Sequence, residues 1–301
     1  MSKRNLADVL RSGRLLVSDG AWGTLLKAKG LQAGECPDRW SLDHPREVRA
    51  IAEAYCAAGA DLVETNSFGA NALQLDHYGL AGRAAEISEA AARLSAGAAA
   101  AAGGERWVIA SVGPTGRILM MGDVTEATLS AAFREQVAAL ARGGADAICI
   151  ETMSDIQEAL LALRAVKEQT ACTAIVTFTF SRTRQGGFRT MMGVSPEAAA
   201  TAMLAGGADI IGTNCGNGSE GMVEIVRAMR AVAGETPILV QANAGLPRQV
   251  NGTDVFPETP AEMAAQVPRL VAAGASAIGG CCGTTPAHIA AIRAAVDARR
   301  S

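Results

Sequence analysis

The sequence predicts an α/β fold, a single (β/α)8 TIM barrel spanning residues 1–301. The first observation is a short phrase, Gly-Ala-Asp or Gly-Ala-Ser, that recurs four times along the chain, each time before an apolar run. The second is an alternation of such apolar runs with alanine-rich runs of helical periodicity. Strict strand–helix alternation favours a parallel sheet, and eight units favour a closed barrel.

The eight predicted strands come in two sets. Four follow the repeated phrase, in which the glycine is expected to end a helix in a tight turn; they lie in AGADLVETNSFG from 58, GGADAICIETM from 143, GGADIIGTNCG from 206 and AGASAIGGCCG from 273. Four lie between these; they are LLVSDG from 15, WVIASVG from 107, TAIVTFTF from 173 and PILVQANAG from 237.

The runs between the predicted strands indicate helices. In REVRAIAEAYCAAGA, the apolar residues Val48, Ile51, Ala52, Tyr55 and Cys56 fall on one helical face. Three helices are predicted to begin at a hydroxyl residue followed by proline, the usual N-cap and first helical position; the pairs are Ser195-Pro196, Thr259-Pro260 and Thr285-Pro286.

Composition excludes several classes of function. The 301 residues are 49% hydrophobic with a formal charge of −3 and no long basic run, which argues against a nucleic-acid partner. No apolar stretch approaches the ~20 residues of a membrane span, and the first residues lack the pattern of a signal peptide. We therefore expect a cytoplasmic protein, in which seven cysteines are reduced thiols or metal ligands.

The barrel separates the acidic residues into two groups. Asp61, Asp146 and Asp209 precede their strands and are expected on the rim that serves stability. The other polar residues follow their strands and are expected on the rim that carries chemistry; they are Asp19, Glu64, Glu151, Asn66, Asn214, Asn243, Cys215, Cys281 and Cys282.

Three cysteines on the functional rim predict a zinc site. Cys215 ends the sixth strand and Cys281-Cys282 ends the eighth. Three thiolates suit Zn²⁺ and leave one tetrahedral position open, as a catalytic site requires. The flanking Gly279, Gly280 and Gly283 are expected to give the backbone the φ freedom that turns both adjacent sulfurs to one ion. Three other cysteines fit small buried apolar residues, and Cys36 has no predicted role; the three are Cys56, Cys149 and Cys172.

An open tris-thiolate zinc suits one reaction class. Its negative charge makes it a poor generator of hydroxide, whereas a thiol that coordinates zinc loses its proton at neutral pH. The site therefore predicts S-alkylation of a substrate thiol. One alternative is a non-enzymatic binding module with a structural zinc site, although such sites normally have four protein ligands. Another is a phosphate-binding barrel lyase or aldolase; its Schiff-base form needs a rim lysine, and none of the four lysines ends a strand.

Seven short motifs at the ends of the predicted strands and in the loops after them belong together. They are DGAWGT (19–24), ETNSFGAN (64–71), GPTG (113–116), IETM (150–153), GTNCG (212–216), ANAGLP (242–247) and GGCCGTTP (279–286). With these motifs the chain resembles the homocysteine S-methyltransferase family, which includes the zinc- and homocysteine-binding module of cobalamin-dependent methionine synthase and the betaine–homocysteine methyltransferases. The resemblance covers nearly the whole chain, and GGCCGTTP paired with the earlier cysteine is its most specific part.

The resemblance implies a role for each matching position. Cys215, Cys281 and Cys282 would be the zinc ligands, and homocysteine the substrate. Asp19, the backbone of Gly20 and Ala21, and Glu151 would hold the amino-acid end of homocysteine. Asn243 matches an asparagine that can occupy the open zinc position before the substrate arrives. The alternative for Asn243 is a loop cap, and Glu64 would either line the mouth or tie its strand to a neighbour.

The methyl donor implied by the resemblance is a methylated corrinoid. Because the 301 residues of this chain leave no room for corrinoid or folate modules, we expect a separate corrinoid protein to dock over the barrel mouth. The alternative is betaine or another onium donor such as S-methylmethionine, bound by cation–π attraction. The tyrosines of the animal betaine enzymes are replaced by Gly69 and Thr152, which leaves Trp22 and Trp40 as candidates for an aromatic cage.

Overall fold

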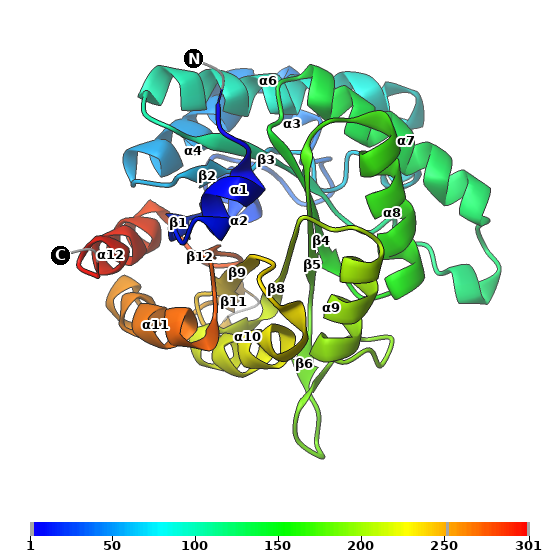
Figure 1. Ribbon diagram of the computed structural model, residues 1–301. Coiled ribbons are helices and arrows are strands. Elements are labelled where there is room, and N and C mark those ends of the chain that lie inside the picture. Colours follow the sequence, from blue (N-terminus) through cyan, green and yellow to red (C-terminus); the bar gives the residue numbers. More distant parts are fainter. Residues whose placement is uncertain (1–2, 251–252, 300–301) are drawn as a thin grey trace.

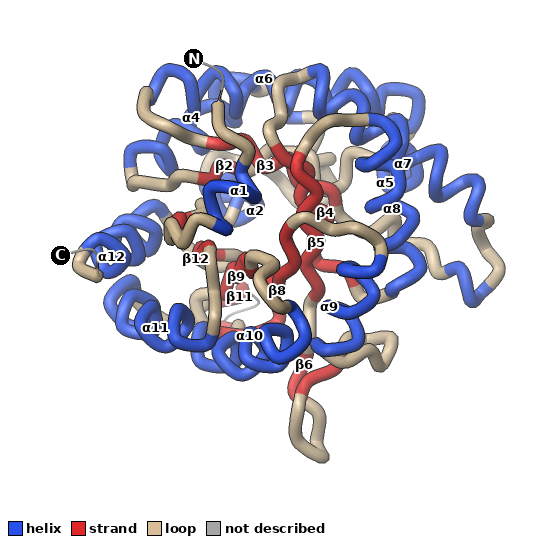
Figure 2. Tube along the Cα trace, viewed as in Figure 1, coloured by secondary structure: helices blue, strands red, loops and turns tan. Residues whose placement is uncertain are grey.

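A computed structural model describes residues 3–250 and 253–299 and confirms the predicted barrel. Its eight parallel strands form one sheet in the order β1-β12-β9-β8-β5-β4-β3-β2, and a parallel bridge between Ser18 and Leu62 closes it (Figures 1 and 2). The strands are β1 (Leu16–Val17), β2 (Leu62–Val63), β3 (Trp107–Val112), β4 (Ala147–Met153), β5 (Thr173–Phe178), β8 (Ile210–Gly218), β9 (Ile238–Asn243) and β12 (Ala277–Gly280).

One long helix follows each barrel strand and lies on its outer side, so that a ring of helices surrounds the strands (Figure 2). These helices are α4 (Pro45–Ala57), α6 (Ala84–Ala102), α7 (Glu126–Arg142), α8 (Ile156–Gln169), α9 (Pro196–Ala205), α10 (Ser219–Ala233), α11 (Pro260–Ala273) and α12 (Pro286–Asp297). All five residues of the predicted apolar face on α4 are buried. Each hydroxyl–proline pair begins a helix as predicted, at α9, α11 and α12.

Shorter elements occupy the loops between these strands and helices. Two antiparallel hairpins follow β5 and β9, and the first of them projects from the barrel (Figure 1). The hairpins are β6 (Ser181–Arg182) with β7 (Phe188–Arg189) and β10 (Arg248–Val250) with β11 (Thr253–Val255). The short helices are α1 (Leu6–Arg11), α2 (Trp22–Ala28), α3 (Trp40–Asp43), α5 (Ala72–Leu75), η1 (Asp76–Tyr78), η2 (Ala81–Arg83) and η3 (Leu119–Met121).

The repeated phrase is a turn that joins a helix to the next strand. Its glycine has a positive φ in all four copies, which stops the helix without a Cβ clash; the angles are 92° at Gly59, 102° at Gly144, 85° at Gly207 and 108° at Gly274. The residue two positions later accepts a hydrogen bond from a backbone N–H of the adjacent strand. These contacts are Asp61 from Val17, Asp146 from Val108, Asp209 from Ala174 and Ser276 from Ile238.

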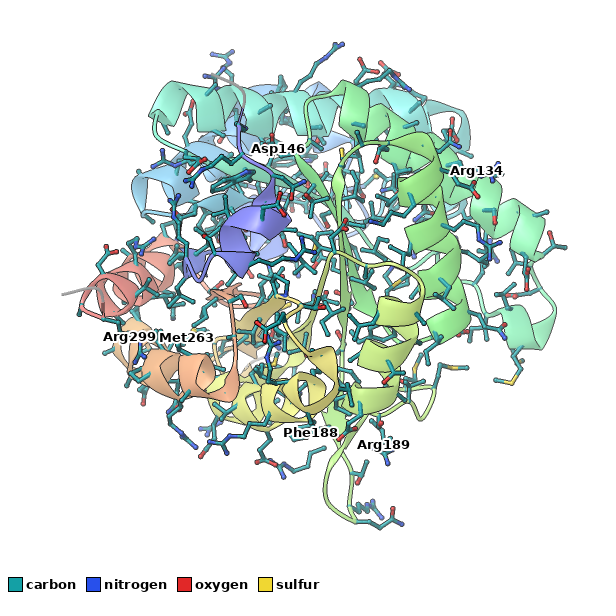
Figure 3. All side chains as sticks on the ribbon, viewed as in Figure 1. Arg134, Asp146, Phe188, Arg189, Met263 and Arg299 are labelled. Carbon is teal, nitrogen blue, oxygen red and sulfur yellow. The ribbon has the colours of Figure 1, made fainter. Side chains whose placement is uncertain are left out.

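These side chains therefore stabilise the end of the barrel where the strands begin, as predicted. Asp146, which is labelled in Figure 3, also accepts a hydrogen bond from Lys3 Nζ at 2.7 Å, and Asp209 accepts one from Lys167 Nζ at 2.8 Å. Helix α1 covers the same end of the barrel and is in the foreground of Figure 1. Its residues Leu6 and Leu10 are buried in one cluster with the first inward-facing residues of the strands, such as Leu16 and Ile210. At the opposite end, where the strands finish, the loops that follow the strands form the surface of the barrel.

None of the helices in the described part of the chain combines the length and the apolar character that a bilayer crossing demands.

We predict that Asp209→Ala lowers the free energy of unfolding by about 1–2 kcal/mol, because it leaves the Ala174 N–H without its acceptor. Lys167→Met, which removes only the half-exposed ion pair to the same carboxylate, is expected to cost less than about 1 kcal/mol. Urea unfolding of the two variants measures the difference. Equal losses would show that the ion pair, rather than the turn, is what Asp209 contributes.

Candidate active site

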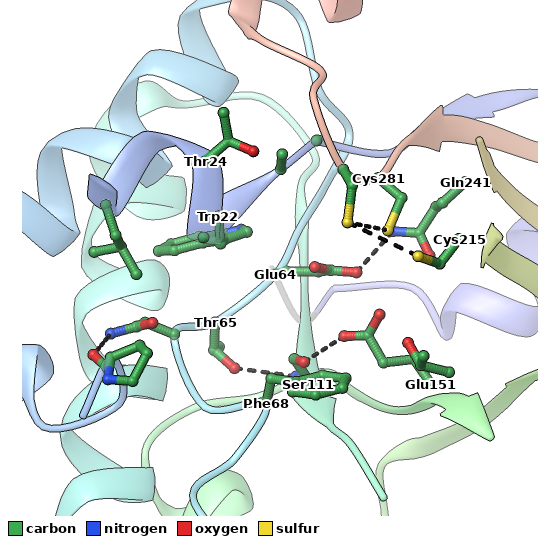
Figure 4. Close-up of a pocket in the computed structure, with 18 of the residues that line it drawn as sticks. Trp22, Thr24, Glu64, Thr65, Phe68, Ser111, Glu151, Cys215, Gln241 and Cys281 are labelled. Carbon is green, nitrogen blue, oxygen red and sulfur yellow. Dashed lines mark hydrogen bonds between the residues drawn. The ribbon is translucent and has the colours of Figure 1, made fainter. Parts of the chain in front are cut away.

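The three rim cysteines converge at the end of the barrel where the strands finish. Cys215 lies within β8, and Cys281 and Cys282 follow β12 directly. The Sγ atom of Cys282 lies 3.8 Å from that of Cys215 and 4.0 Å from that of Cys281, and all three sulfurs are within 4.8 Å of one another (Figure 4). Zn–S bonds of about 2.3 Å at tetrahedral angles separate sulfurs by about 3.8 Å. The spacing of the three thiols thus fits a single zinc ion.

The glycines around the cysteine pair act in two different ways. Gly283 has φ +79°, in agreement with the prediction of unusual backbone freedom. For Gly279 and Gly280 that prediction was wrong, since neither has a positive φ. They are required for space instead: a Cβ on Gly279 would lie 2.6 Å from Ser18 Cβ, and a Cβ on Gly280 would lie 2.4 Å from Thr284 Oγ1. β12 can approach β1 and the turn after it only without these side chains.

The cysteine cluster favours a thiolate. Hydrogen bonds from Cys281 and Cys282 lower the pKa of Cys215 to about 3, and a side-chain hydrogen bond with Asn243 acts in the same direction. The same interactions raise the pKa of Cys281, whose proton is shared with the thiolate. A soft, negatively charged sulfur cluster of this kind is a ligand set for Zn²⁺.

Three carboxyl groups lie beside the cysteines. Glu151 accepts hydrogen bonds from Ser111 and, at 3.0 Å, from Asn214 Nδ2. Glu64 accepts from Gln241 Nε2 at 2.7 Å, so it both lines the mouth and ties β2 to β9, the two roles that the sequence left open. Asp19 Oδ2 accepts from Trp22 Nε1 at 3.0 Å and from the Glu64 backbone N–H at 2.8 Å.

Burial raises the pKa of all three carboxyl groups. Desolvation is the largest cause in each case, and it brings the pKa of Asp19 and of Glu151 to about 7. The pKa of Glu64 is raised well above its ordinary value, by burial first and then by repulsion from Glu151 and Asp19. Acidic groups in a cleft whose pKa is raised by burial and by one another are typical of functional sites.

A cavity of about 330 Å³ opens between these groups. Among the described residues that line it, none is Lys, Arg or His, so no protein cation offsets its thiols and carboxyls. The lining residues are Gly20, Ala21, Trp22, Gly23, Thr24, Leu26, Pro37, Asp38, Glu64, Thr65, Asn66, Ser67, Phe68, Ser111, Glu151, Thr152, Cys215, Gln241, Gly280, Cys281 and Cys282.

The structure places the other predicted residues at different depths. Gly20 and Ala21 line the cavity, but the Ala21 N–H already donates to Thr284 Oγ1 at 3.0 Å. Asp19 is fully buried beneath the lining, and its Oδ1 has no hydrogen-bond partner in the described structure. Asn243 is also buried beneath the lining, and its Oδ1 likewise has no partner there.

Two predicted candidates lie elsewhere. Trp22 lines the cavity, whereas Trp40 lines a separate hollow with His44 and Tyr78 and cannot form part of an aromatic cage at the mouth. Cys36, which had no predicted role, lines that second hollow as well.

Sequence reasoning missed Ser111, Gln241 and Thr284. Ser111 and Gln241 are polar residues inside the apolar runs WVIASVG and PILVQANAG, at positions whose side chains face the barrel interior. A polar residue at an inward position near the end of a strand was the available signal. Thr284 gave no such signal, because its contact with Ala21 joins residues 263 positions apart.

Comparisons with known proteins agree with this geometry. The family described as homocysteine S-methyltransferase matches residues 16–296. Methionine synthase of Mycobacterium tuberculosis is 35% identical over 97% of this chain, and that of Mycobacterium leprae is 33% identical over 94%. The chain spans about a quarter of the length of these relatives, 25% and 24% respectively.

A solved structure covers the whole fold. The metallated form of the homocysteine methyltransferase MmuM from Escherichia coli superposes with a TM-score of 0.79 and 25% identity, over 97% of this chain and 99% of that one. The family and the fold together support an enzyme with methyltransferase activity rather than a binding module. This chain belongs to the homocysteine S-methyltransferase family.

Proposed function

We propose that the chain methylates homocysteine to methionine with a zinc ion held by Cys215, Cys281 and Cys282. The observation that carries this proposal is the spacing of the three sulfurs, which fits the edges of a zinc tetrahedron, together with the cavity that all three line. Zinc bound there supplies a site at which a substrate thiol is deprotonated at neutral pH and remains nucleophilic. That the related E. coli enzyme has a metallated form supports the assignment.

The carboxyl groups would bind the ammonium group of homocysteine. Glu151 lines the cavity and contacts the substrate directly, while Asp19 contributes negative charge from beneath the lining. Buried carboxylates are stabilised by a paired cation, and the ammonium group of the substrate would supply that cation to these carboxyl groups. A substrate carboxylate that binds at Gly20 and Ala21 would take the place of the Thr284 hydroxyl at the Ala21 N–H. Asn243, beside Cys215, would stand at the metal before the substrate arrives.

A methylated corrinoid on a separate protein is the methyl donor that we propose. A corrin macrocycle is larger than a cavity of about 330 Å³ and would have to be presented from outside. The loops of the mouth expose apolar side chains that suit a docking partner; they are Phe68, Ile118, Met120, Met121, Met191 and Leu246. The relatives named methionine synthase, of which this chain spans a quarter, support a donor brought by another module or protein.

We place this reaction in a single barrel domain, residues 1–301, in the cytoplasm, where its seven free thiols remain reduced.

Betaine or S-methylmethionine is the second candidate donor. Trp22 and Phe68 both line the cavity, and two aromatic faces can attract an onium group.

The zinc assignment predicts that purified protein holds one zinc per chain and that Cys282→Ala loses the metal together with thiol methylation. Cys172→Ala, which changes a half-buried thiol in the loop before β5, is the matched control and should keep both. Metal analysis by mass spectrometry and a methionine assay give the two readouts. Full zinc content in Cys282→Ala would contradict the ligand set.

The acidic cluster predicts a pH dependence for amino-acid binding. The pKa of Glu151 is about 7, and the ionised form binds an ammonium group, so affinity should fall as pH drops through 7. Methionine, which has the same amino-acid end but no thiol proton, isolates this effect from thiol ionisation. Calorimetry on zinc-loaded protein should give a dissociation constant about tenfold higher at pH 6 than at pH 8.

Glu151→Gln should weaken methionine binding at pH 8 and reduce this pH dependence. Glu158→Gln is the control, since Glu158 is also buried with a raised pKa but bonds Thr115 and lies outside the cavity. An unchanged pH profile in Glu151→Gln would remove Glu151 from the ammonium site.

The donor proposal predicts methionine formation from homocysteine and methylcobalamin, and faster formation when the methyl group is carried by a corrinoid protein. Betaine, S-methylmethionine and methyltetrahydrofolate are assayed in parallel. Met191→Asp, which puts a charge on an exposed rim position, should raise the KM for the corrinoid protein and leave homocysteine affinity unchanged. Turnover with betaine or S-methylmethionine alone would replace the corrinoid by the second candidate.

A further inference from the structure

We propose that Asn214 is a positioning residue that holds Cys215 and Glu151, on two non-adjacent strands, in the geometry of the active site. The proposal rests on the function assigned above, in which Cys215 binds the metal and Glu151 binds the substrate. Asn214 lies in β8 directly before Cys215, is fully buried, and faces the interior of the barrel.

Strand alternation alone would point the Cys215 thiol away from the site. Along β8, Ile210 packs in the cluster inside the barrel, whereas Ile211 packs in the cluster between sheet and helices. The same alternation turns Asn214 inward and would turn Cys215 outward, toward the helices. On β4, Cys149 belongs to the inner cluster, so Glu151 is inward and Thr152 would be outward.

The backbone departs from regular strand geometry at just these positions. Among the described residues, Thr152 and Cys215 are the non-glycine residues with positive φ, at 61° and 59°. For a β-branched residue such as threonine this conformation is a genuine outlier. Such outliers persist only where the surroundings enforce them, and they cluster at functional sites.

Both outliers coincide with irregular pairing of the strands. β4 advances three residues from Ile150 to Met153, while its partner β5 advances two, from Val176 to Phe178. β8 advances four residues from Asn214 to Gly218, while β9 advances two, from Gln241 to Asn243. Extra residues of this kind bend a strand and re-aim its side chains, here turning the Cys215 sulfur into the mouth.

The Asn214 side chain joins the two irregular segments. Its Oδ1 accepts from the Thr152 backbone N–H at 2.8 Å and from Thr177 Oγ1 at 2.7 Å. Its Nδ2 donates to Thr152 Oγ1 at 2.7 Å and to Glu151 Oε2 at 3.0 Å. These four hydrogen bonds use the whole capacity of a side-chain amide. The amide thus reaches from β8 past the intervening β5 to β4.

The two halves of the amide have separable effects. The Oδ1 atom holds the left-handed backbone at Thr152, and the same contact holds β8 at Asn214, directly before Cys215. The Nδ2 atom orients the Glu151 carboxylate, whose other oxygen is held by Ser111. Loss of both halves should disturb metal and substrate binding together, whereas loss of the donor half alone should disturb substrate binding.

The test compares Asn214→Ala and Asn214→Asp with the wild type by Co²⁺ titration and by homocysteine calorimetry on zinc-loaded protein. Thiolate-to-cobalt charge-transfer absorption reports how many cysteines bind the ion, independently of turnover. We expect Asn214→Ala to weaken Co²⁺ binding by about tenfold or more, with reduced charge-transfer intensity. Asn214→Asp keeps the acceptor atom and puts a carboxylate oxygen against Glu151 in place of the donor. It should keep the cobalt spectrum and raise the homocysteine dissociation constant by about tenfold, because the Glu151 carboxylate is no longer held in place.

Asn217→Ala is the matched control. Asn217 is a buried asparagine on the same strand, and within the part of the chain that the structure describes its Nδ2 donates to the Phe180 backbone carbonyl, at 2.6 Å, and not to β4. This variant should also lose thermal stability, although less than Asn214→Ala because one hydrogen bond is lost rather than four, and it should keep both affinities within about twofold of the wild type. Rescue in Asn214→Asp of metal binding, but not of substrate binding, is a pattern that general destabilisation does not produce.

Three outcomes would overturn the inference. Wild-type affinities for Co²⁺ and homocysteine in Asn214→Ala would show that the amide positions nothing. Equal losses of these affinities in Asn217→Ala would show that Asn214 contributes only to stability. If Asn214→Ala does not fold, Asn214→Asp carries the test alone, and an unchanged homocysteine dissociation constant in it refutes the proposal. A wild-type protein that binds neither Co²⁺ nor homocysteine would instead refute the proposed function.

Discussion

The constraint on which the site depends is the burial of acidic groups at the mouth of the barrel. Three thiols and the carboxyl groups of Asp19, Glu64 and Glu151 are gathered in a buried region, and none of the described residues that line its cavity is basic. Ionising a buried group without a partner is costly, so burial raises the pKa of each carboxyl group. A metal ion at the sulfurs and an ammonium group at the carboxyls would each relieve this cost in a different part of the cavity.

The end of the barrel opposite the cluster is held by regular contacts. There the Gly-Ala-Asp and Gly-Ala-Ser turns join neighbouring strands, and α1 closes the interior with apolar side chains. At the mouth, by contrast, Thr152 and Cys215 keep left-handed backbone conformations that cost about 1–3 kcal/mol each. The saturated amide of Asn214, bonded across β5 to β4, offsets part of that strain and makes the two distortions depend on one another.

Much of this protein was determined by its sequence alone. The repeated phrase, the hydroxyl–proline caps and the amphipathic spacing predicted the eight units and their order, because turns, caps and apolar faces are local properties of the chain. The rule that chemistry lies at the carboxyl ends of barrel strands then predicted that Cys215 lies near Cys281 and Cys282. The three thiols predicted S-alkylation, and the resemblance to a family implied homocysteine as the substrate.

Only the tertiary structure decided how the site is built in detail. Alternation along β8 predicts an outward Cys215, and the irregular pairing that reverses it is accompanied by two hydrogen bonds between Asn214 and Thr152, 62 residues apart. The reason that Gly279 and Gly280 have no side chain is a close approach to Ser18 and Thr284, which no local pattern encodes. The sequence offered Trp22 and Trp40 equally as candidates for an aromatic cage, yet they line different hollows. Contacts between residues distant in the chain fix these features, since local propensity does not specify which strands will meet.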